Sequence, residues 1–214
     1  MKICTYVMTS DAGLAPNPFW GACTLAICTP NHVGARLEEG DWIAGFLSRP
    51  RGGGLVYAMK IDEILPFDDY FQDPRYKSKK PVRRGAWPKP VGDNMYFRGE
   101  GKEWRQHPTN FHTDALEKDT AHPHVFISHD FYYFGKNRPI RCIPSPGCAL
   151  EEYWLNRKVA QGLKYFRESE YPSECSAFIK WLRAEGPALI SDVPLDAGIS
   201  AREGCADSVI NSCS

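Results

Sequence analysis

Residues 40–49 read GDWIAGFLSR and residues 55–76 read LVYAMKIDEILPFDDYFQDPRY, and these two stretches decide the fold. A Gly-Asp turn precedes the apolar run Trp42–Leu47, and the glycine tip at 52–54 separates this run from the second stretch. Within Leu55–Ile64, positions 55, 57, 59 and 61 are all apolar, and the positions between them hold both apolar and charged residues. This alternation is typical of a half-buried strand. We therefore predict two strands that pair in antiparallel fashion across the glycine tip.

Four further short apolar runs, each close to a turn signal, predict additional strands. They are Ile3–Met8, Ala22–Thr29, Val125–Ser128 and Phe131–Phe134. Several short strands at this spacing favour a small mixed β-barrel. Residues 65–123 show little periodicity and many Pro, Gly, charged and aromatic residues, so we expect an irregular insert there, and so long an insert usually serves function.

The last third of the chain differs in composition from the rest, and its sequence predicts helices. Leu150–Arg167 is rich in helix formers, and Ser173 can cap a second helix over Glu174–Glu185 that ends at Gly186-Pro187. The predicted fold class is therefore α+β, a barrel with an inserted irregular region and C-terminal helices. The expected organisation is a domain at 1–145, a helical segment packed on it at 146–187 and a loose tail at 188–214.

Composition excludes several classes of protein. The 214 residues include 26 basic and 26 acidic side chains, so a histone-like coat of bulk DNA is not expected, because phosphate binding requires clustered cations. No apolar run is long enough to span a membrane, and the N-terminal residues do not read as a signal peptide, so we expect a cytoplasmic protein. The eight cysteines form no CxxC pair, which predicts reduced, buried thiols and neither a metal site nor a cofactor.

The strand pair and the acidic, aromatic segment after it resemble the barrel of the PUA superfamily, whose ASCH, EVE and YTH-like members bind nucleic acids or unusual bases. Six stretches together are similar to the family called nucleotide modification-associated domain two: APNPFWGACTLAICTP (15–30), GDWIAGF (40–46), LVYAMKIDEI (55–64), FDDYFQDPRY (67–76), GDNMYF (92–97) and FISHDFYYFG (126–135). The resemblance covers about residues 1–145 and implies a role in systems that make or handle modified DNA bases. Gln106 and His112 also stand where the family pattern has Gln and His.

The loop around Asn17 is the first candidate binding site. Pro16 and Pro18 restrict the backbone on both sides of Asn17, whose amide could read a base edge as donor and acceptor together. Phe19 and Trp20 could stack on a flipped or single-stranded base. The alternative is a proline-rich turn whose aromatic rings cover the end of the barrel.

Further polar candidates follow in the insert. Asp93 or Asn94, after Gly92, could bind a base amide or a sugar hydroxyl, and Gln106 and His112 could join them; such Gly-Asp-Asn triplets more often only turn the chain. Because His titrates near neutral pH, His112 with Asp11 and Asp114 could form an acid/base set. The candidate catalytic residues are thus Asp11, Asp93 and His112.

A run of basic residues suits a nucleic-acid backbone. Between residues 75 and 89 seven cations occur without an acid, and Tyr76 and Trp87 lie among them. The expected phosphate contacts are Arg75, Lys79, Lys80, Arg83 and Arg84. The acidic residues just before the run could fold back on it, which would leave a solvated charged loop.

From the sequence we therefore expect a protein that binds a nucleobase or free nucleotide, with a modified base in DNA as the leading ligand, in a pocket near Asn17, Phe19, Asp93, Asn94 and His112. The alternative is an enzyme that alters such a base or nucleotide with an Asp/His acid-base pair. A third class is a protein-interaction module of a defence or modification system. The sequence does not choose between binding and turnover, and it leaves the oligomeric state open.

Overall fold

The computed structural model describes residues 1–27, 35–137, 162–184, 189–190 and 192–197. These residues divide into two compact units, each assembled from separate stretches of the chain. Unit 1 takes its described residues from 1–9, 35–62 and 128–193, and unit 2 from 10–34, 63–127 and 194–214. Strands predominate over a few helices in the described part, so the α+β class is confirmed.

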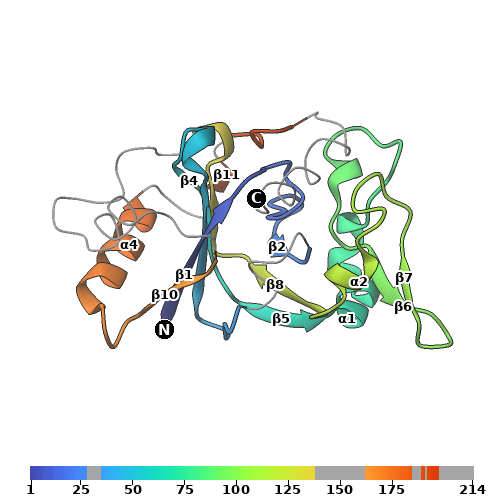
Figure 1. Cartoon of the computed structure of the whole chain (residues 1–214), viewed down its shortest axis with the longest axis horizontal. Helices are drawn as coiled ribbons and strands as arrows, with labels where there is room; N and C mark the ends of the chain where they lie inside the picture. Colours follow the sequence, from blue (N-terminus) through green and yellow to red (C-terminus); the bar gives the residue numbers. More distant parts are fainter. Residues whose placement is uncertain (28–34, 138–161, 185–188, 191, 198–214) are drawn as a thin grey trace, which may run out of the picture. The chain divides into compact units, whose positions relative to one another are not determined.

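Unit 1 is built on a six-stranded sheet with the order β10-β1-β3-β4-β9-β11 (Figure 1). The strands are β1 (Lys2–Met8), β3 (Trp42–Leu47), β4 (Leu55–Lys60), β9 (Phe131–Tyr133), β10 (Lys164–Arg167) and β11 (Leu189–Ile190), and two short 3-10 turns, η1 (Arg49–Arg51) and η4 (Gly135–Asn137), accompany them. β3 pairs with β4 in antiparallel fashion, with Trp42 opposite Lys60, which confirms the predicted strand pair. β1 runs parallel to β3.

The helix α4 (Pro172–Ala184) covers one face of this sheet. Cys175, Phe178 and Leu182 are spaced by one turn or two, so they share one side of the helix, and all three belong to the same buried cluster as Trp42 and Phe46 of β3. Proline suits the first helical position because the amide hydrogen that it lacks would have no partner there. The helix lies close to the predicted range, and Figure 1 shows it (orange) beside the sheet.

Unit 2 contains a three-stranded sheet, a hairpin and several short helical turns around its own core. The sheet has the order β2-β8-β5, formed by β2 (Cys23–Leu25), β8 (His124–Ser128, whose last residue counts with unit 1) and β5 (Glu63–Pro66), and the hairpin joins β6 (Tyr96–Arg98) to β7 (Trp104–Gln106). The turns are α1 (Phe67–Gln72), η2 (Pro74–Lys79), η3 (Lys89–Val91) and α2 (Leu116–Asp119). The stretch 65–123, expected as an irregular insert, holds only short elements joined by loops, and it is packed around buried aromatic residues such as Phe67, Tyr70 and Tyr96.

Three other expectations are corrected. The described strands form no closed barrel, because β10 and β11 lie at opposite edges of the six-stranded sheet, so the barrel is not confirmed. β4 is buried on both faces from Leu55 to Met59 and not on one face only. The end of the helix expected over 150–167 is wrong, because Lys164–Arg167 is strand β10, paired with β1; residues 150–161 lie outside the described residues.

Cys4, Cys23 and Cys175 are buried and carry no disulfide, as predicted for reduced thiols. The other five cysteines lie outside the described residues. Burial raises the pKa of Cys4 and of Cys23 to about 12, so both stay protonated and are unsuited to act as nucleophiles. In the described part of the chain, no helix has the length and hydrophobicity that a bilayer crossing requires.

Candidate functional site

A buried polar network in unit 2, called here the lysine cluster, consists of Asn17, Thr24, Tyr70, Lys79 and Asp93. Every member is at most 1% exposed. The cluster assembles because the backbones of Asn17 and Thr24 exchange two hydrogen bonds, of 2.8 and 2.9 Å, and so hold the proline-rich loop against β2. The sequence-predicted candidates Asn17, Lys79 and Asp93 thus meet, although 62 residues separate the first two.

Lys79 occupies the centre of this cluster. Its ammonium group donates to the backbone carbonyl of Asn17 (3.0 Å), to Asn17 Oδ1 (3.0 Å) and to the carbonyl of Ala22 (2.8 Å). A lysine has three N–H donors, and all three are used. Burial lowers the pKa of Lys79 to about 8, against an attraction to Asp93 that raises it. Lys79 therefore does not lie on the surface with the other cations of its run, and the folded chain leaves it no donor for a phosphate.

Asp93 is held by hydroxyl groups. Thr24 Oγ1 donates to its Oδ2 (2.6 Å) and the Tyr70 hydroxyl to its Oδ1 (2.8 Å). Burial raises the pKa of Asp93, while the charge of Lys79 and the two hydroxyl donors act in the opposite direction. Because its oxygens are engaged inside the protein, Asp93 binds the scaffold and not an external ligand in this conformation.

The neighbours of Asp93 explain why the Gly-Asp-Asn triplet is buried. A Cβ atom at Gly92 would lie 2.3 Å from the carbonyl oxygen of Lys79, so only glycine permits this close backbone approach. The amide of Asn94 donates to the carbonyls of Tyr70 (2.9 Å) and Tyr76 (3.1 Å). Asn17 likewise donates to the carbonyl of Val91 (2.7 Å). Asn17 and Asn94 therefore tie segments of unit 2 together.

A second network, the histidine cluster, consists of Tyr96 on β6, Gln106 on β7, His112 and Asp119 on α2. His112 Nδ1 lies 2.6 Å from Asp119 Oδ2, and the Tyr96 hydroxyl donates to the same oxygen at 2.8 Å. Gln106 Nε2 donates to the carbonyl of His112 at 3.0 Å. The resemblance-based pair Gln106 and His112 is thus brought together, and Tyr96 and Asp119 are members that the sequence reasoning missed.

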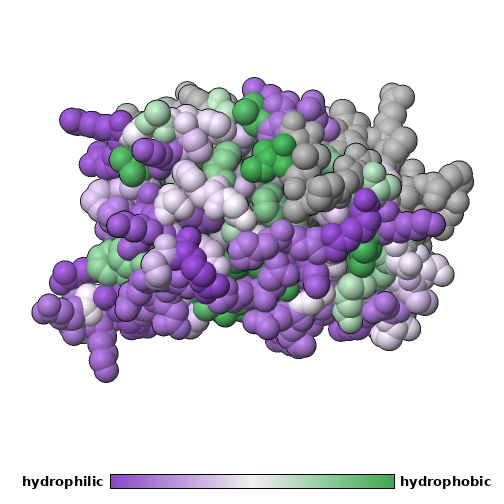
Figure 2. All heavy atoms as spheres, turned by 180° about the vertical axis from the view of Figure 1, so that it is seen from behind, coloured by the Kyte–Doolittle hydropathy of each residue, from purple (hydrophilic) through white to green (hydrophobic). Residues whose placement is uncertain are grey.

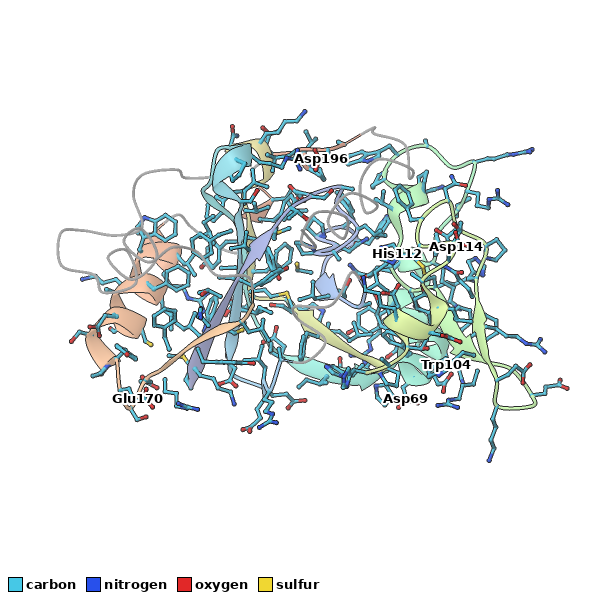
Figure 3. All side chains as sticks on the ribbon, in the orientation of Figure 1. Asp69, Trp104, His112, Asp114, Glu170 and Asp196 are labelled. Carbon is cyan, nitrogen blue, oxygen red and sulfur yellow. The ribbon has the colours of Figure 1, made fainter. Side chains whose placement is uncertain are left out.

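The local backbone places His112 in this cluster. Its φ of 55° is in the left-handed region, which non-glycine residues rarely adopt. His112 begins a turn in which the amide of Ala115 donates to the carbonyl of His112 (Figure 3). The helix α2 begins directly after Ala115. As a result the side chains of His112 and Asp119, seven positions apart, meet.

One oxygen of Asp119 is not satisfied by any residue that the structure describes. The residue is 1% exposed, and its Oδ1 has no hydrogen-bond partner among the described residues. A buried acceptor of this kind calls for a donor from outside the described residues, because leaving it unsatisfied is costly. An open depression lined by Asp114, Leu116, Glu117 and Lys118 lies along the same helical turn.

Three aromatic rings form a third feature, the aromatic triplet. Phe19 packs edge-on against Trp20 (5.6 Å between ring centroids) and against Trp87 (5.1 Å). Phe19 is nearly buried, Trp20 is half-buried, and Trp87 is 42% exposed. Phe19 therefore supports the two tryptophans, and Trp87 is the ring with the largest open surface.

The basic run divides into separate environments. Arg75 is paired with Asp73 (2.6 Å) and Glu63 (2.9 Å), so the preceding acids do fold back on the start of the run. Lys80 lies over the ring of Phe71, 3.5 Å from its centroid. Arg83 and Arg84 are exposed and form no ion pair within the part of the chain that the structure describes. Figure 2 shows one face of the molecule, on which hydrophilic residues (purple) are more frequent than hydrophobic ones (green).

Asp11 is not brought to His112 by any contact described. Its Oδ2 accepts from the backbone of Leu195 (3.1 Å), and its own amide donates to Asp196 Oδ2 (2.8 Å). Asp11 thus fastens residues 195–196 to unit 2. Asp114 is exposed and receives a hydrogen bond from Thr113, so the carboxylate partner of His112 is Asp119.

No sequence pattern could have identified Asp119. It stands in a four-residue helix, and neither i,i+4 spacing nor a motif links it to His112. The two meet across the turn that begins at the left-handed residue His112. No group of three metal-ligating side chains gathers among the described residues.

Comparison with known proteins identifies a family. A family model described as nucleotide modification associated domain 2 matches residues 1–200, well beyond the 145 residues of the sequence resemblance, so the C-terminal helix α4 falls within the matched pattern. No curated protein and no solved structure matches the chain.

Proposed function

Since the chain belongs to the family described as nucleotide modification associated domain 2, we propose that it binds a nucleobase or nucleotide, with a modified base in DNA as its ligand. The binding site proposed is the histidine cluster in unit 2. The observation that carries the proposal is the Asp119 carboxylate, which is buried, is oriented through its Oδ2 by two neighbours, and has no partner at Oδ1 within the described part of the chain.

The chemistry of the cluster fits a base edge. Nucleobases present N–H donors beside acceptors, and a buried carboxylate oxygen is a strong acceptor for such a donor. Tyr96 and His112 fix the orientation of Asp119, so a ligand would meet a preorganised acceptor. Gln106 supports the backbone of His112 and with it the turn that carries the imidazole.

A second candidate function, acid/base catalysis on such a base or nucleotide, is supported by the 2.6 Å contact between His112 Nδ1 and Asp119 Oδ2. A carboxylate that accepts from Nδ1 fixes the imidazole tautomer and places the lone pair on Nε2, the arrangement that general bases use. Asp119 would then be the positioning residue and His112 the proton acceptor.

The test compares binding and turnover in the same samples. Wild type and Asp119→Asn are titrated with a panel of modified and unmodified nucleotides and short DNAs, and the products are analysed by mass spectrometry. The loss of a charged acceptor should weaken binding of the preferred ligand about tenfold to a hundredfold, from ~1.5–3 kcal/mol for a hydrogen bond to a charged group. Asp69→Asn removes an exposed carboxylate of α1 in the same unit and is the matched control.

His112→Gln separates the two candidates. A binding site should lose modest affinity, whereas a catalytic base should lose ~10²–10⁴-fold in rate with little change in binding. The thermal midpoint of each variant is measured first, because Asp119 is buried. A folded Asp119→Asn protein that binds the whole panel as wild type does would refute the site.

A further inference from the structure

The loop at residues 82–89, VRRGAWPK, exposes apolar surface although its backbone is firmly held. Val82 is 49% exposed and Trp87 is 42% exposed. The amide of Val82 donates to the carbonyl of Lys89 (3.0 Å), and that of Lys89 donates to Ala86 (2.9 Å). An apolar ring that is exposed on an ordered loop needs no folding to meet a partner, so little entropy is lost on binding.

A side chain from outside fixes the loop further. Asn110 donates to the carbonyl of Arg83 (2.9 Å), and its Oδ1 accepts from Arg83 Nε (3.1 Å). On its inner side Trp87 rests edge-on against Phe19, at 5.1 Å between centroids. Trp87 is therefore buttressed on one side and open on the other.

The charged side chains of the loop that carries Trp87 are all positive. Arg83, Arg84 and Lys89 are exposed, and the loop contains no acidic residue. Arg84 and Lys89 pair with no carboxylate among the residues that the structure describes, in contrast to Arg75 earlier in the run. An open aromatic ring beside unneutralised cations matches a strand of nucleic acid, in which bases stack and phosphates carry the opposite charge.

We propose that loop 82–89 is a docking surface for single-stranded DNA, on which Trp87 stacks with a base while Arg84 and Lys89 bind the neighbouring phosphates. This inference rests on the proposed function and deepens it, because it makes the partner a DNA strand and not a free nucleotide. A single strand is required, since a base inside a duplex is already stacked on both faces.

The side chains of the loop also bear on the choice between DNA and RNA. None of them carries a hydrogen-bond acceptor, and the nearby Asn110 uses both ends of its amide on Arg83. Proteins that select RNA make hydrogen bonds to the 2′-hydroxyl, for which the side chains of the loop offer only donors that phosphates would occupy. The surface therefore suits a strand that lacks this hydroxyl.

The experiment measures fluorescence anisotropy of a labelled oligothymidine of about 12 nucleotides, a length within the range of single-strand sites. Trp87→Ala should weaken binding about tenfold to a hundredfold, whereas Trp87→Phe, which keeps a ring, should retain most of the affinity. Arg84→Ala combined with Lys89→Ala should reduce the salt dependence, log K against log salt, by about 1.4, from ~0.7 for each phosphate contact. Lys180→Ala, at an exposed position of α4, is the control and should change neither quantity.

Each outcome decides the proposal. The double variant Arg84→Ala, Lys89→Ala would overturn the proposal if it kept the affinity and the salt slope of wild type. This outcome is decisive even if Trp87→Ala fails to fold, because the two substitutions of the double variant are at exposed positions. Tighter binding of an oligouridine RNA would overturn the assignment to DNA, and lack of any oligonucleotide binding would leave a protein partner as the occupant and also refute it. A Trp87→Ala protein that still binds thymidine monophosphate but no longer binds the strand would support the proposal.

The same measurements separate this surface from the histidine cluster. If Asp119→Asn binds nucleotides and DNA as wild type does while the loop variants lose the strand, the proposed ligand site is wrong and the docking surface stands. If Asp119→Asn no longer binds the nucleotide and the loop variants still bind the strand, the docking surface is wrong and the proposed ligand site stands.

Discussion

Replacing Lys79 by Met tests whether this lysine is part of the scaffold of unit 2 or a contact for nucleic acid. Methionine keeps an unbranched apolar stem of similar length but removes all three donors. The substitution would leave three buried carbonyl acceptors without their donor, on Asn17 and Ala22, and Asp93 without its nearby positive charge. Breaking a buried charge arrangement by removing one partner costs about 3–5 kcal/mol, and we expect a loss of that size at neutral pH.

The pH dependence of this loss follows from the pKa of Lys79. Burial lowers that pKa from 10.5 to about 8, so between these values the unfolded chain binds a proton that the folded chain has released. Stability rises with pH wherever the unfolded state binds more protons. At about 1.4 kcal/mol for each pKa unit, wild type should gain up to about 3 kcal/mol over Lys79→Met between pH 8 and pH 10.5.

The assay is urea unfolding at a series of pH values in the presence of a reductant. The quantity to plot is the difference in unfolding free energy between wild type and variant, because the titration of tyrosines and cysteines contributes equally to both proteins. Lys77→Met removes an exposed lysine from the same turn, η2, and is the matched control. A Lys79→Met protein as stable as Lys77→Met, or a difference that does not grow above pH 8, would refute the buried position of Lys79.

Three further predictions concern the scaffold. Gly92→Ala should lower the unfolding free energy by about 1–3 kcal/mol in chemical denaturation, because its Cβ would clash with the carbonyl of Lys79; wild-type stability would contradict that close approach. Phe178→Ala should cost about 3–5 kcal/mol by opening a cavity under α4, whereas Lys180→Ala on its exposed side should change stability by less than about 0.5 kcal/mol; equal effects would contradict the assigned helix face. Because burial raises the pKa of Asp93, the folded chain binds the extra proton above the ordinary value of 3.8, so wild type should lose stability relative to Asp93→Asn as pH rises from there; paired unfolding curves without a slope, or with the opposite slope, would contradict the raised pKa of Asp93.

The strands could be predicted from the sequence because their signal is local. Trp42–Leu47 and Phe131–Tyr133 are apolar and bounded by turns, and the structure has them within one residue of the expected ranges. Lys164–Arg167 is the end of a stretch, Leu150–Arg167, that is rich in helix formers and so predicts a helix. Pairing with β1 outweighs that propensity, and the pairing partner lies about 160 residues away along the chain, where no local pattern can report it.

The candidate site shows the same division. The sequence identified Asn17, Asp93 and His112 as unusual polar residues, but it could not tell which of them face solvent. Lys79 looked like one cation of a basic run, because the acceptors that bury it belong to a loop about 60 residues earlier. Asp119 had no signal in the sequence, since no motif or helical i,i+4 spacing links it to His112, which it contacts across a turn with a left-handed residue.

The buried lysine cluster has a consequence for the exposed surface. Lys79 binds the carbonyls of Asn17 and Ala22, which are the two ends of the short segment that carries Phe19. Phe19 in turn supports Trp87. A loss of Lys79 would therefore loosen the ring beneath Trp87 without removing any surface charge, so it should weaken strand binding while the salt slope stays unchanged. Removal of the surface cations should instead reduce the salt slope, because these cations bind phosphates and do not contribute to the support of Trp87. The two classes of lysine and arginine in this one basic run are thus distinguished by the salt dependence of binding, even though the sequence presents them as equivalent.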